Sequence, residues 1–182
     1  FRARHAIPAD RSVALFVGRV AHEKNIGFLL QAMNYALWQR PDLILVIAGE
    51  GPALETLQRQ VTELRIDHHV RFVGYLDRKQ ELPDCYAAAS VFVFASRTET
   101  QGLVLLEAMA AGLPVYAIAH LGTTSIVAPQ RGAVAAPEEP EAFGKGLAAL
   151  LSNTTALASL AREGQEFARE WSAPERAREL AA

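Results

Sequence analysis

The sequence predicts an α/β fold, a doubly wound parallel sheet of the Rossmann-like type. Short apolar runs of strand length alternate with segments whose apolar residues recur at helical spacing. The runs are apolar throughout, which is typical of parallel strands buried on both faces. Glycine or polar residues follow the runs, where such sheets bind ligands. We find no internal repeat or low-complexity linker and therefore expect one domain over residues 1–182.

Five apolar runs are expected to form the strands. The first is closed by Gly18, and the second by the turn sequence Gly-Glu-Gly-Pro at 49–52. The expected strands are Val13–Val17, 43–48, 70–73, 91–95 and 114–119.

The segments between the runs are expected to be helices that cover the sheet. In 26–38, apolar residues at 26, 29, 30, 33 and 37 have helical spacing, with Asn25 as the expected N-cap. Pro52 is well placed to start the next helix, and Gly102 to open the helix after the fourth strand. The expected helices are 26–38, 53–64, 82–89, 102–112, a turn with a short helix at 122–127, then 141–151, 156–171 and a helical-looking end at 174–182.

Composition excludes several functions. The chain has 182 residues, 51% of them apolar, and a net charge of −2, which argues against nucleic acid as the main partner. Cys85 is the only cysteine, so no internal disulfide or cysteine-based metal site is expected, as in a reducing, cytoplasmic compartment. No run is long enough to span a bilayer and no signal peptide is visible. The abrupt start at Phe1 suggests an excised domain.

Glu107 is the first candidate functional residue, because it interrupts the apolar run 102–112. A helix that is apolar on all sides is expected to be buried. An ionised carboxylate there costs several kcal/mol unless it is paired or hydrogen-bonded. The structural alternative is a buried glutamate satisfied by an arginine or by backbone groups.

The start of the same helix is expected to bind an anion. The free backbone N–H groups of Gln101, Gly102 and Leu103 would point out of the helix N-terminus, where the helix dipole favours negative charge. Glu99 and Glu107 would offer carboxylates to sugar hydroxyls at the same place. Backbone N–H groups that donate hydrogen bonds to a phosphate, beside carboxylates that accept hydrogen bonds from sugar hydroxyls, fit a nucleotide sugar.

Cationic residues follow the first strand. Arg19 comes directly after Gly18, and Lys24 lies five residues further on. The planar guanidinium matches phosphate oxygens and the lysine acts as a point charge. Two cations opposite a helix N-terminus would neutralise a diphosphate without a metal, and we expect no metal and no bound cofactor. The alternative for Lys24 is an ordinary solvated lysine. No Gly-x-Gly-x-x-Gly or Walker sequence opens the first helix.

With these motifs, the chain resembles the C-terminal, donor-binding half of GT-B retaining glycosyltransferases of family 4, the "group 1" family. The resemblance covers nearly the whole chain. It is carried by Phe-Val-Gly-Arg-Val at 16–20, Glu-Lys-Asn at 23–25, Val-Ile-Ala-Gly-Glu-Gly-Pro at 46–52 and Val-Arg-Phe-Val-Gly-Tyr at 70–75. Glu99 and Glu107 are eight positions apart, as in the family's Glu-x7-Glu signature, and Ala-Met-Ala-Ala-Gly-Leu-Pro-Val follows at 108–115.

The resemblance implies a role for each site residue. Arg19 and Lys24 would grip the donor diphosphate, Glu107 the ribose hydroxyls, and Glu99 would face the transferred sugar. The amides of Gly102 and Leu103 would support phosphate or sugar, and Gly74 and Tyr75 would lie near the base. The chain departs from the family pattern where many relatives have a second glycine and a glutamate, because Thr123 and Ser125 stand there.

The function implied is hexosyl transfer with retention from a UDP- or GDP-sugar to an acceptor. The run 96–103 is similar to that of bacterial glucosyltransferases acting on diacylglycerol, which suggests a lipid acceptor and a peripheral position at the inner membrane face. In GT-B enzymes a separate N-terminal domain contributes the acceptor site, so this chain alone is expected to bind donor weakly and to transfer nothing. The alternatives are a sugar-nucleotide epimerase, a non-catalytic nucleotide-sugar module and, more remotely, a dehydrogenase.

Overall fold

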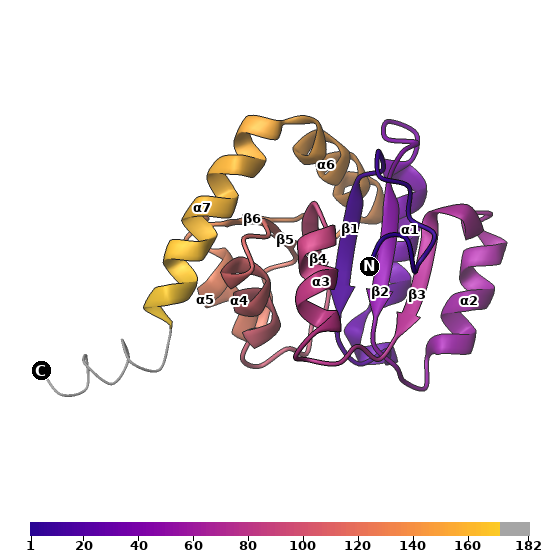
Figure 1. Ribbon diagram of the computed structural model, residues 1–182, viewed down its shortest axis with the longest axis horizontal. Helices are drawn as coiled ribbons and strands as arrows, with labels where there is room; N and C mark the ends of the chain where they lie inside the picture. Colours follow the sequence, from indigo (N-terminus) through magenta and orange to yellow (C-terminus); the bar gives the residue numbers. More distant parts are fainter. Residues whose placement is uncertain (172–182) are drawn as a thin grey trace, which may run out of the picture.

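A computed structural model describes residues 1–171 and contains one six-stranded sheet (Figure 1). All strands are parallel, in the order β3-β2-β1-β4-β5-β6. Their bounds are β1 Val13–Val17, β2 Ile44–Ala48, β3 Val70–Gly74, β4 Val91–Phe94, β5 Val115–Ala117 and β6 Ala133–Ala135. The predicted doubly wound Rossmann-like fold is confirmed, and this is the common strand order of that fold. The helix expected at 174–182 lies outside the described residues.

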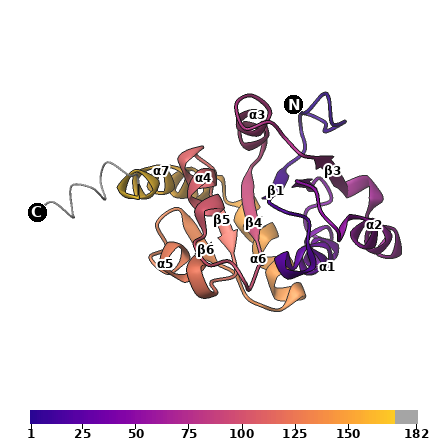
Figure 2. The ribbon, with the colours of Figure 1, turned by 90° about the horizontal axis from the view of Figure 1, so that it is seen from below.

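Helices cover both faces of the sheet (Figure 2). α3 and α4 lie on one side, and α1 and α6 lie on the other, where they pack against each other. α7 packs along α4 and also contacts α6. The helices are α1 Ile26–Ala36, α2 Leu54–Glu63, α3 Glu81–Ala88, α4 Leu103–Ala110, α5 Thr124–Val127, α6 Pro140–Ser152 and α7 Thr154–Glu170, with short 3-10 turns η1 His22–Lys24, η2 Asp67–His69 and η3 Leu121–Thr123.

Two local expectations need correction. β6 was not predicted, because a three-residue edge strand is too short to show a recognisable apolar pattern. Asn25 precedes α1 as predicted, but its side chain does not cap the helix. The residue adopts a left-handed conformation, with φ 54°, and its side-chain amide instead donates to the Ala95 carbonyl at 3.2 Å. Asn25 therefore ties the first loop to the end of β4.

The core lies along the two central strands. Phe16 of β1 stacks with Phe94 of β4 at a ring separation of 6.0 Å, and both are almost fully buried. β1 and β4 are neighbours in the sheet; the strands that follow β1 in the chain, β2 and β3, lie on one side of this pair, and the strands that follow β4, β5 and β6, lie on the other. The following loops therefore diverge, and a crevice forms at the carboxyl ends of these strands. Among residues 1–171, no helix has the length and apolar content needed to cross a membrane.

Candidate functional site

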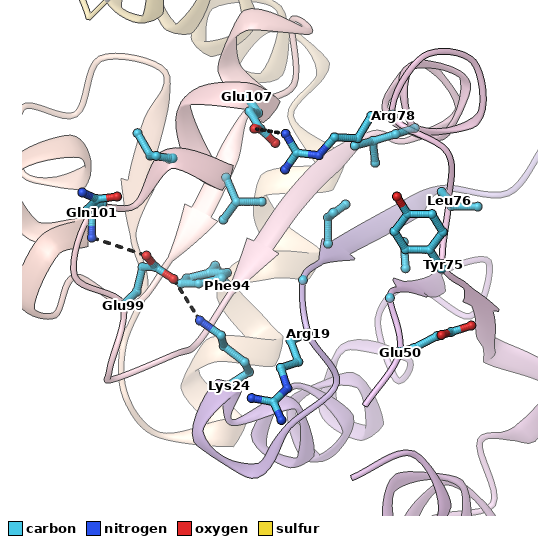
Figure 3. A pocket seen from close by; sticks show the side chains of 17 residues that line it. Arg19, Lys24, Glu50, Tyr75, Leu76, Arg78, Phe94, Glu99, Gln101 and Glu107 are labelled. Atoms are coloured by element: carbon cyan, nitrogen blue, oxygen red, sulfur yellow. Dashed lines mark hydrogen bonds and ion pairs between the residues drawn. The ribbon is translucent and has the colours of Figure 1, made fainter. Parts of the chain in front are cut away.

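A cleft of about 630 Å³ opens at the carboxyl ends of the strands, at the β1–β4 switch point. It is lined by the ends of β1, β2 and β4, by the segment after β3 and by one side of α4 (Figure 3). The cleft contains eight of the ten site residues predicted from the sequence: Gly18, Arg19, Lys24, Tyr75, Glu99, Gln101, Leu103 and Glu107.

The two predicted residues that do not line the cleft are Gly74 and Gly102. Gly74 acts through its carbonyl, which accepts a hydrogen bond of 2.8 Å from the Gly49 N–H. Gly102 is the N-cap of α4 and has φ 67°, a left-handed conformation that favours glycine. Both glycines therefore shape the backbone around the site.

Glycines allow the loops after β1 and β2 to meet. The Val20 N–H donates to the Glu50 carbonyl at 2.9 Å, and the Ala53 N–H donates to the Val20 carbonyl at 3.0 Å. A Cβ on Gly49 would overlap the Gly18 carbonyl, and one on Gly51 would overlap the Val20 carbonyl. Only residues without a side chain permit this approach, which forms the floor of the cleft.

The loop after β4 is tied to the loop after β1. Besides the Asn25 bond, the Ser96 hydroxyl donates to the Glu23 carbonyl at 3.3 Å, and the Thr98 hydroxyl donates to the same carbonyl at 3.4 Å. These bonds hold residues from opposite halves of the sheet side by side. As a result, Lys24 lies next to Glu99 (Figure 3).

The Glu99 carboxylate is held by three donors. Lys24 Nζ donates to Oε2 at 3.0 Å, and the backbone N–H groups of Gly102 and Gln101 donate to Oε1 at 3.2 and 3.4 Å. Burial raises the pKa of Glu99, but these hydrogen bonds outweigh burial and leave the pKa below its ordinary value. We expected the amides of Gln101 and Gly102 to be free for phosphate. This expectation was wrong for the unliganded chain, because Glu99 occupies them.

The other side of the glutamate loop rests on the segment after β5. The Gly122 N–H donates to the Glu99 carbonyl at 3.0 Å, and a Cβ on Gly122 would overlap the Thr100 carbonyl. Thr123 is fully buried, and its hydroxyl oxygen accepts a hydrogen bond of 2.9 Å from the His120 N–H. Thr123, at a position where we expected the family's glycine, therefore stabilises this support.

Glu107 is not the buried carboxylate that its apolar neighbours suggested. Its side chain is 41% exposed and faces the cleft, where its Oε1 lies 3.8 Å from Nη1 of Arg78 (Figure 3). The opposite side of α4, including Leu105, Ala108 and Met109, is buried in the core. Leu103 and Glu107 are one turn apart, so they share the side that lines the cleft. Because almost every residue of α4 is apolar, its composition could not predict which side of the helix lines the cleft.

Arg19 and Tyr75 are both largely exposed at the cleft. The side chain of Arg19 is 67% exposed and lies 4.0 Å from Glu23, a loose ion pair. Its guanidinium is therefore available to a ligand. Tyr75 is 69% exposed and lies across the cleft from Glu99 and Gln101 (Figure 3).

Arg78 and six apolar lining residues were not predicted as part of the site; the six are Val17, Ala48, Leu76, Leu82, Phe94 and Val104. Arg78 belongs to the charged turn Asp-Arg-Lys at 77–79, four residues after the end of β3. That position after a strand end was the only signal in the sequence. No group of acidic, histidine or cysteine side chains within 1–171 is arranged to hold a metal ion.

Comparison with known proteins supplies a family. The family description "Glycosyl transferases group 1" matches residues 1–170. The chain is 38% identical over 116 residues to an alpha-monoglucosyldiacylglycerol synthase of Streptococcus pneumoniae, covering 64% of this chain and 26% of the relative. It is 32% identical over 175 residues to a GDP-mannose-dependent alpha-(1-6)-phosphatidylinositol monomannoside mannosyltransferase of Mycolicibacterium smegmatis, covering 92% and 45%.

Solved structures agree on the fold. Sucrose-phosphate synthase from Thermosynechococcus elongatus matches with a TM-score of 0.82 and 31% identity, covering 92% of this chain and 43% of that one. HepE from Anabaena, solved with UDP and glucose, matches with a TM-score of 0.81 and 22% identity, covering 93% and 46%. The chain thus spans less than half the length of each of these proteins, and its fold is that of one half of a GT-B enzyme.

Proposed function

The chain belongs to the group 1 glycosyltransferase family, and from this premise we propose that its cleft binds a nucleoside-diphosphate hexose as the donor for retaining transfer. The supporting observation is that Arg19, Lys24, Glu99 and Glu107 converge on one cleft at the start of α4. These residues come from three separate segments, and they are the cations and carboxylates that the diphosphate, ribose and hexose of such a donor require.

The charges in the cleft suggest how the donor is accommodated. Arg19, Lys24 and Arg78 are balanced among the lining residues by Glu50, Glu99 and Glu107. A diphosphate would replace Glu99 as the partner of Lys24 and of the α4 amides. Glu99 would then be free to accept hydrogen bonds from the hexose hydroxyls, while Glu107 binds the ribose. The base would lie near Gly18, Gly74 and Tyr75.

The chemical step breaks the bond between the anomeric carbon and the phosphate oxygen and forms a bond between that carbon and an acceptor hydroxyl oxygen, whose proton passes to the departing diphosphate. Positive charge develops on the sugar, and negative charge develops on the departing diphosphate. Arg19, Lys24 and the amides at the start of α4 would stabilise the diphosphate. Fixed groups of this kind are usually the largest contribution to catalysis, and loss of one typically lowers the rate about 100- to 1000-fold.

The whole protein is proposed to complete the reaction with an N-terminal domain that supplies the acceptor site. Two similar proteins are named for transfer to diacylglycerol- or inositol-containing lipids. We therefore propose a lipid acceptor and a cytoplasmic location at the inner membrane face. By itself the 182-residue chain should bind donor but not transfer it.

The direct test is calorimetry of the 182-residue chain with UDP-glucose, UDP-galactose, GDP-mannose and NAD⁺. One of the nucleotide sugars should bind, and at 100 times its dissociation constant it should raise the unfolding free energy by about 2.7 kcal/mol. Glu107→Gln should weaken this binding, whereas Glu63→Gln, an exposed change on α2, should not. Binding of NAD⁺ alone, or of none of the four, would contradict the proposal.

A further inference from the structure

α3 carries a buried polar atom that the proposed mechanism does not use. Tyr86 is only 5% exposed, and its ring packs 6.3 Å from that of Phe92 in β4. Its hydroxyl oxygen is buried and has no hydrogen-bond partner within the described residues. Buried hydroxyls are normally paired, because an unpaired one costs about 1–3 kcal/mol. Leu82, one turn before Tyr86 in α3, lines the cleft, so the unpaired hydroxyl lies on the side of the helix that faces the site and points to a role in function.

The Tyr86 hydroxyl lies close to the charges around Glu107. Burial is the main reason that its pKa lies above the ordinary value. The negative charge of Glu107 raises the pKa further, the positive charge of Arg78 opposes this effect, and a hydrogen-bonding contribution from Glu107 adds a last, smaller increase. No bond between the two groups meets normal hydrogen-bond geometry in the free chain, so the hydroxyl lies within reach of Glu107 without a full bond to it. The phenol is therefore held in its protonated form. A protonated phenol beside a carboxylate is a hydrogen-bond donor facing an acceptor.

Glu107 itself is only loosely held in the unliganded chain. Its ion pair with Arg78 spans 3.8 Å, which is longer than a normal hydrogen bond, and the arginine side chain is 77% exposed. An exposed pair of this kind restrains a carboxylate weakly. Tyr86 differs from Arg78, because its ring is fixed in the core between α3 and β4. Glu107 thus has one movable neighbour and one rigid neighbour.

We propose that Tyr86 is a positioning residue of the donor site, whose hydroxyl donates a hydrogen bond to Glu107 when that carboxylate turns from Arg78 to accept the ribose hydroxyls. The inference rests on the proposed function. A fixed donor to one carboxylate oxygen leaves the other oriented toward the ribose, so less conformational freedom is lost on binding. In the free chain the hydroxyl is within reach of Glu107 but makes no full hydrogen bond, and in the complex that bond is completed.

The test removes the hydroxyl from the protein and, separately, the hydroxyls from the ligand. Tyr86→Phe keeps the ring. Tyr116→Phe is the matched control, because Tyr116 is also buried but donates its hydroxyl to the Phe143 carbonyl at 3.3 Å. Dissociation constants are measured for UDP and GDP, each beside its 2′,3′-dideoxy form, with wild type, both tyrosine variants and Glu107→Gln.

For the ribose nucleotide that binds, Tyr86→Phe should weaken binding about tenfold, the usual effect of one hydrogen bond to a charged group. Binding of the dideoxy form should stay within about twofold, and Tyr116→Phe should change neither. Because its hydroxyl makes no full hydrogen bond in the free chain, Tyr86→Phe should not lower the melting temperature. A purely structural tyrosine would lower it and would weaken both ligands equally.

The outcomes separate the two proposals. If Glu107→Gln weakens only the ribose form and Tyr86→Phe binds like wild type, the Tyr86 inference is overturned while the proposed function stands. If Glu107→Gln also makes no difference between the ligands, the ribose role itself is wrong. If Tyr86→Phe fails to fold, NMR of wild type decides: the labelled Tyr86 phenol carbon should shift with the ribose form and not with the dideoxy form. No shift would refute the inference.

Discussion

Lys24 and Glu99 form a close ion pair across the switch point of the sheet, with Nζ 3.0 Å from Oε2 and side chains only 21% and 19% exposed. The two residues are 75 positions apart in the chain. In the free protein Glu99 thus neutralises the charge of Lys24, the lysine that is proposed to bind the diphosphate. Ligand binding must therefore exchange one anion for another, which avoids leaving a partly buried charge without a partner.

The first prediction concerns acid stability. The pKa of Glu99 is below its ordinary value of 4.5, so the folded chain binds this proton more weakly than the unfolded chain. The stabilisation is complete above the unfolded pKa and is lost as the pH falls through the lower folded pKa. Glu99→Gln should cost about 1.5 kcal/mol at pH 6 and clearly less at pH 3, measured by denaturant unfolding. Glu63→Gln is the control, and an equal cost at both pH values would contradict the assignment.

Arg19 should contribute to binding and not to folding. Its side chain is 67% exposed and its pair with Glu23 spans 4.0 Å, so Arg19→Ala should change the unfolding free energy by less than about 0.5 kcal/mol. It should weaken binding of the nucleoside diphosphate about tenfold, because a charge-assisted hydrogen bond is lost. Calorimetry measures this effect, with Glu23→Ala as the control expected to keep wild-type affinity. Unchanged binding by Arg19→Ala would remove Arg19 from the diphosphate site.

Gly122 should be intolerant of any side chain. A Cβ there would overlap the carbonyl of Thr100, and this backbone belongs to the loop that carries Glu99. Gly122→Ala should cost about 1–3 kcal/mol and should also weaken nucleotide binding, because the loop must shift. Gly27→Ala is the matched control, since its Cβ would meet only the flexible end of Gln60. If both variants have wild-type melting temperatures, the close packing of this loop is not a real constraint.

Thr123 should stabilise the same support through its hydroxyl. Thr123→Val keeps the size of the side chain but puts a methyl group in place of the fully buried Thr123 hydroxyl and leaves the partly buried His120 N–H without its acceptor, so the unfolding free energy should fall by about 1–3 kcal/mol. Ser125→Ala removes an exposed hydroxyl with a bond of only 3.4 Å and should change stability by less than about 0.5 kcal/mol. Thermal unfolding of the two variants gives the comparison. Equal stability of Thr123→Val and wild type would leave the threonine unexplained.

Much of the fold could be read from local patterns, because buried parallel strands are continuous apolar runs. Val13–Val17 was predicted to the residue, and the strands at the next four runs differ from prediction by two residues or fewer at each end. β6 was missed because a three-residue edge strand has no distinctive pattern. Asn25 shows the limit of capping rules, since its side chain reaches a carbonyl 70 positions away instead of the helix it precedes.

The charged residues of the candidate site could mostly be predicted from the sequence, but the ion pairs that they form in the free chain could not. The motif around Glu99 and Glu107 is local, so it could be recognised in the sequence. Burial of Glu107 was predicted wrongly because every neighbour in α4 is apolar, and composition cannot say which side of a helix lines a cleft. Arg78 was missed because it meets Glu107 only through the placement of the turn before α3.

The sequence by itself determined a parallel α/β sheet, the loops that would meet at its carboxyl edge, and the charged residues on those loops, since each depends on neighbours within a few positions. Only the tertiary structure decided that Lys24 meets Glu99, that Arg78 meets Glu107, and that the Tyr86 hydroxyl is buried without a full hydrogen bond. Those relationships depend on β1 lying beside β4 and on how α3 packs over the sheet. Such long-range packing is set by the whole core, and no local segment encodes it.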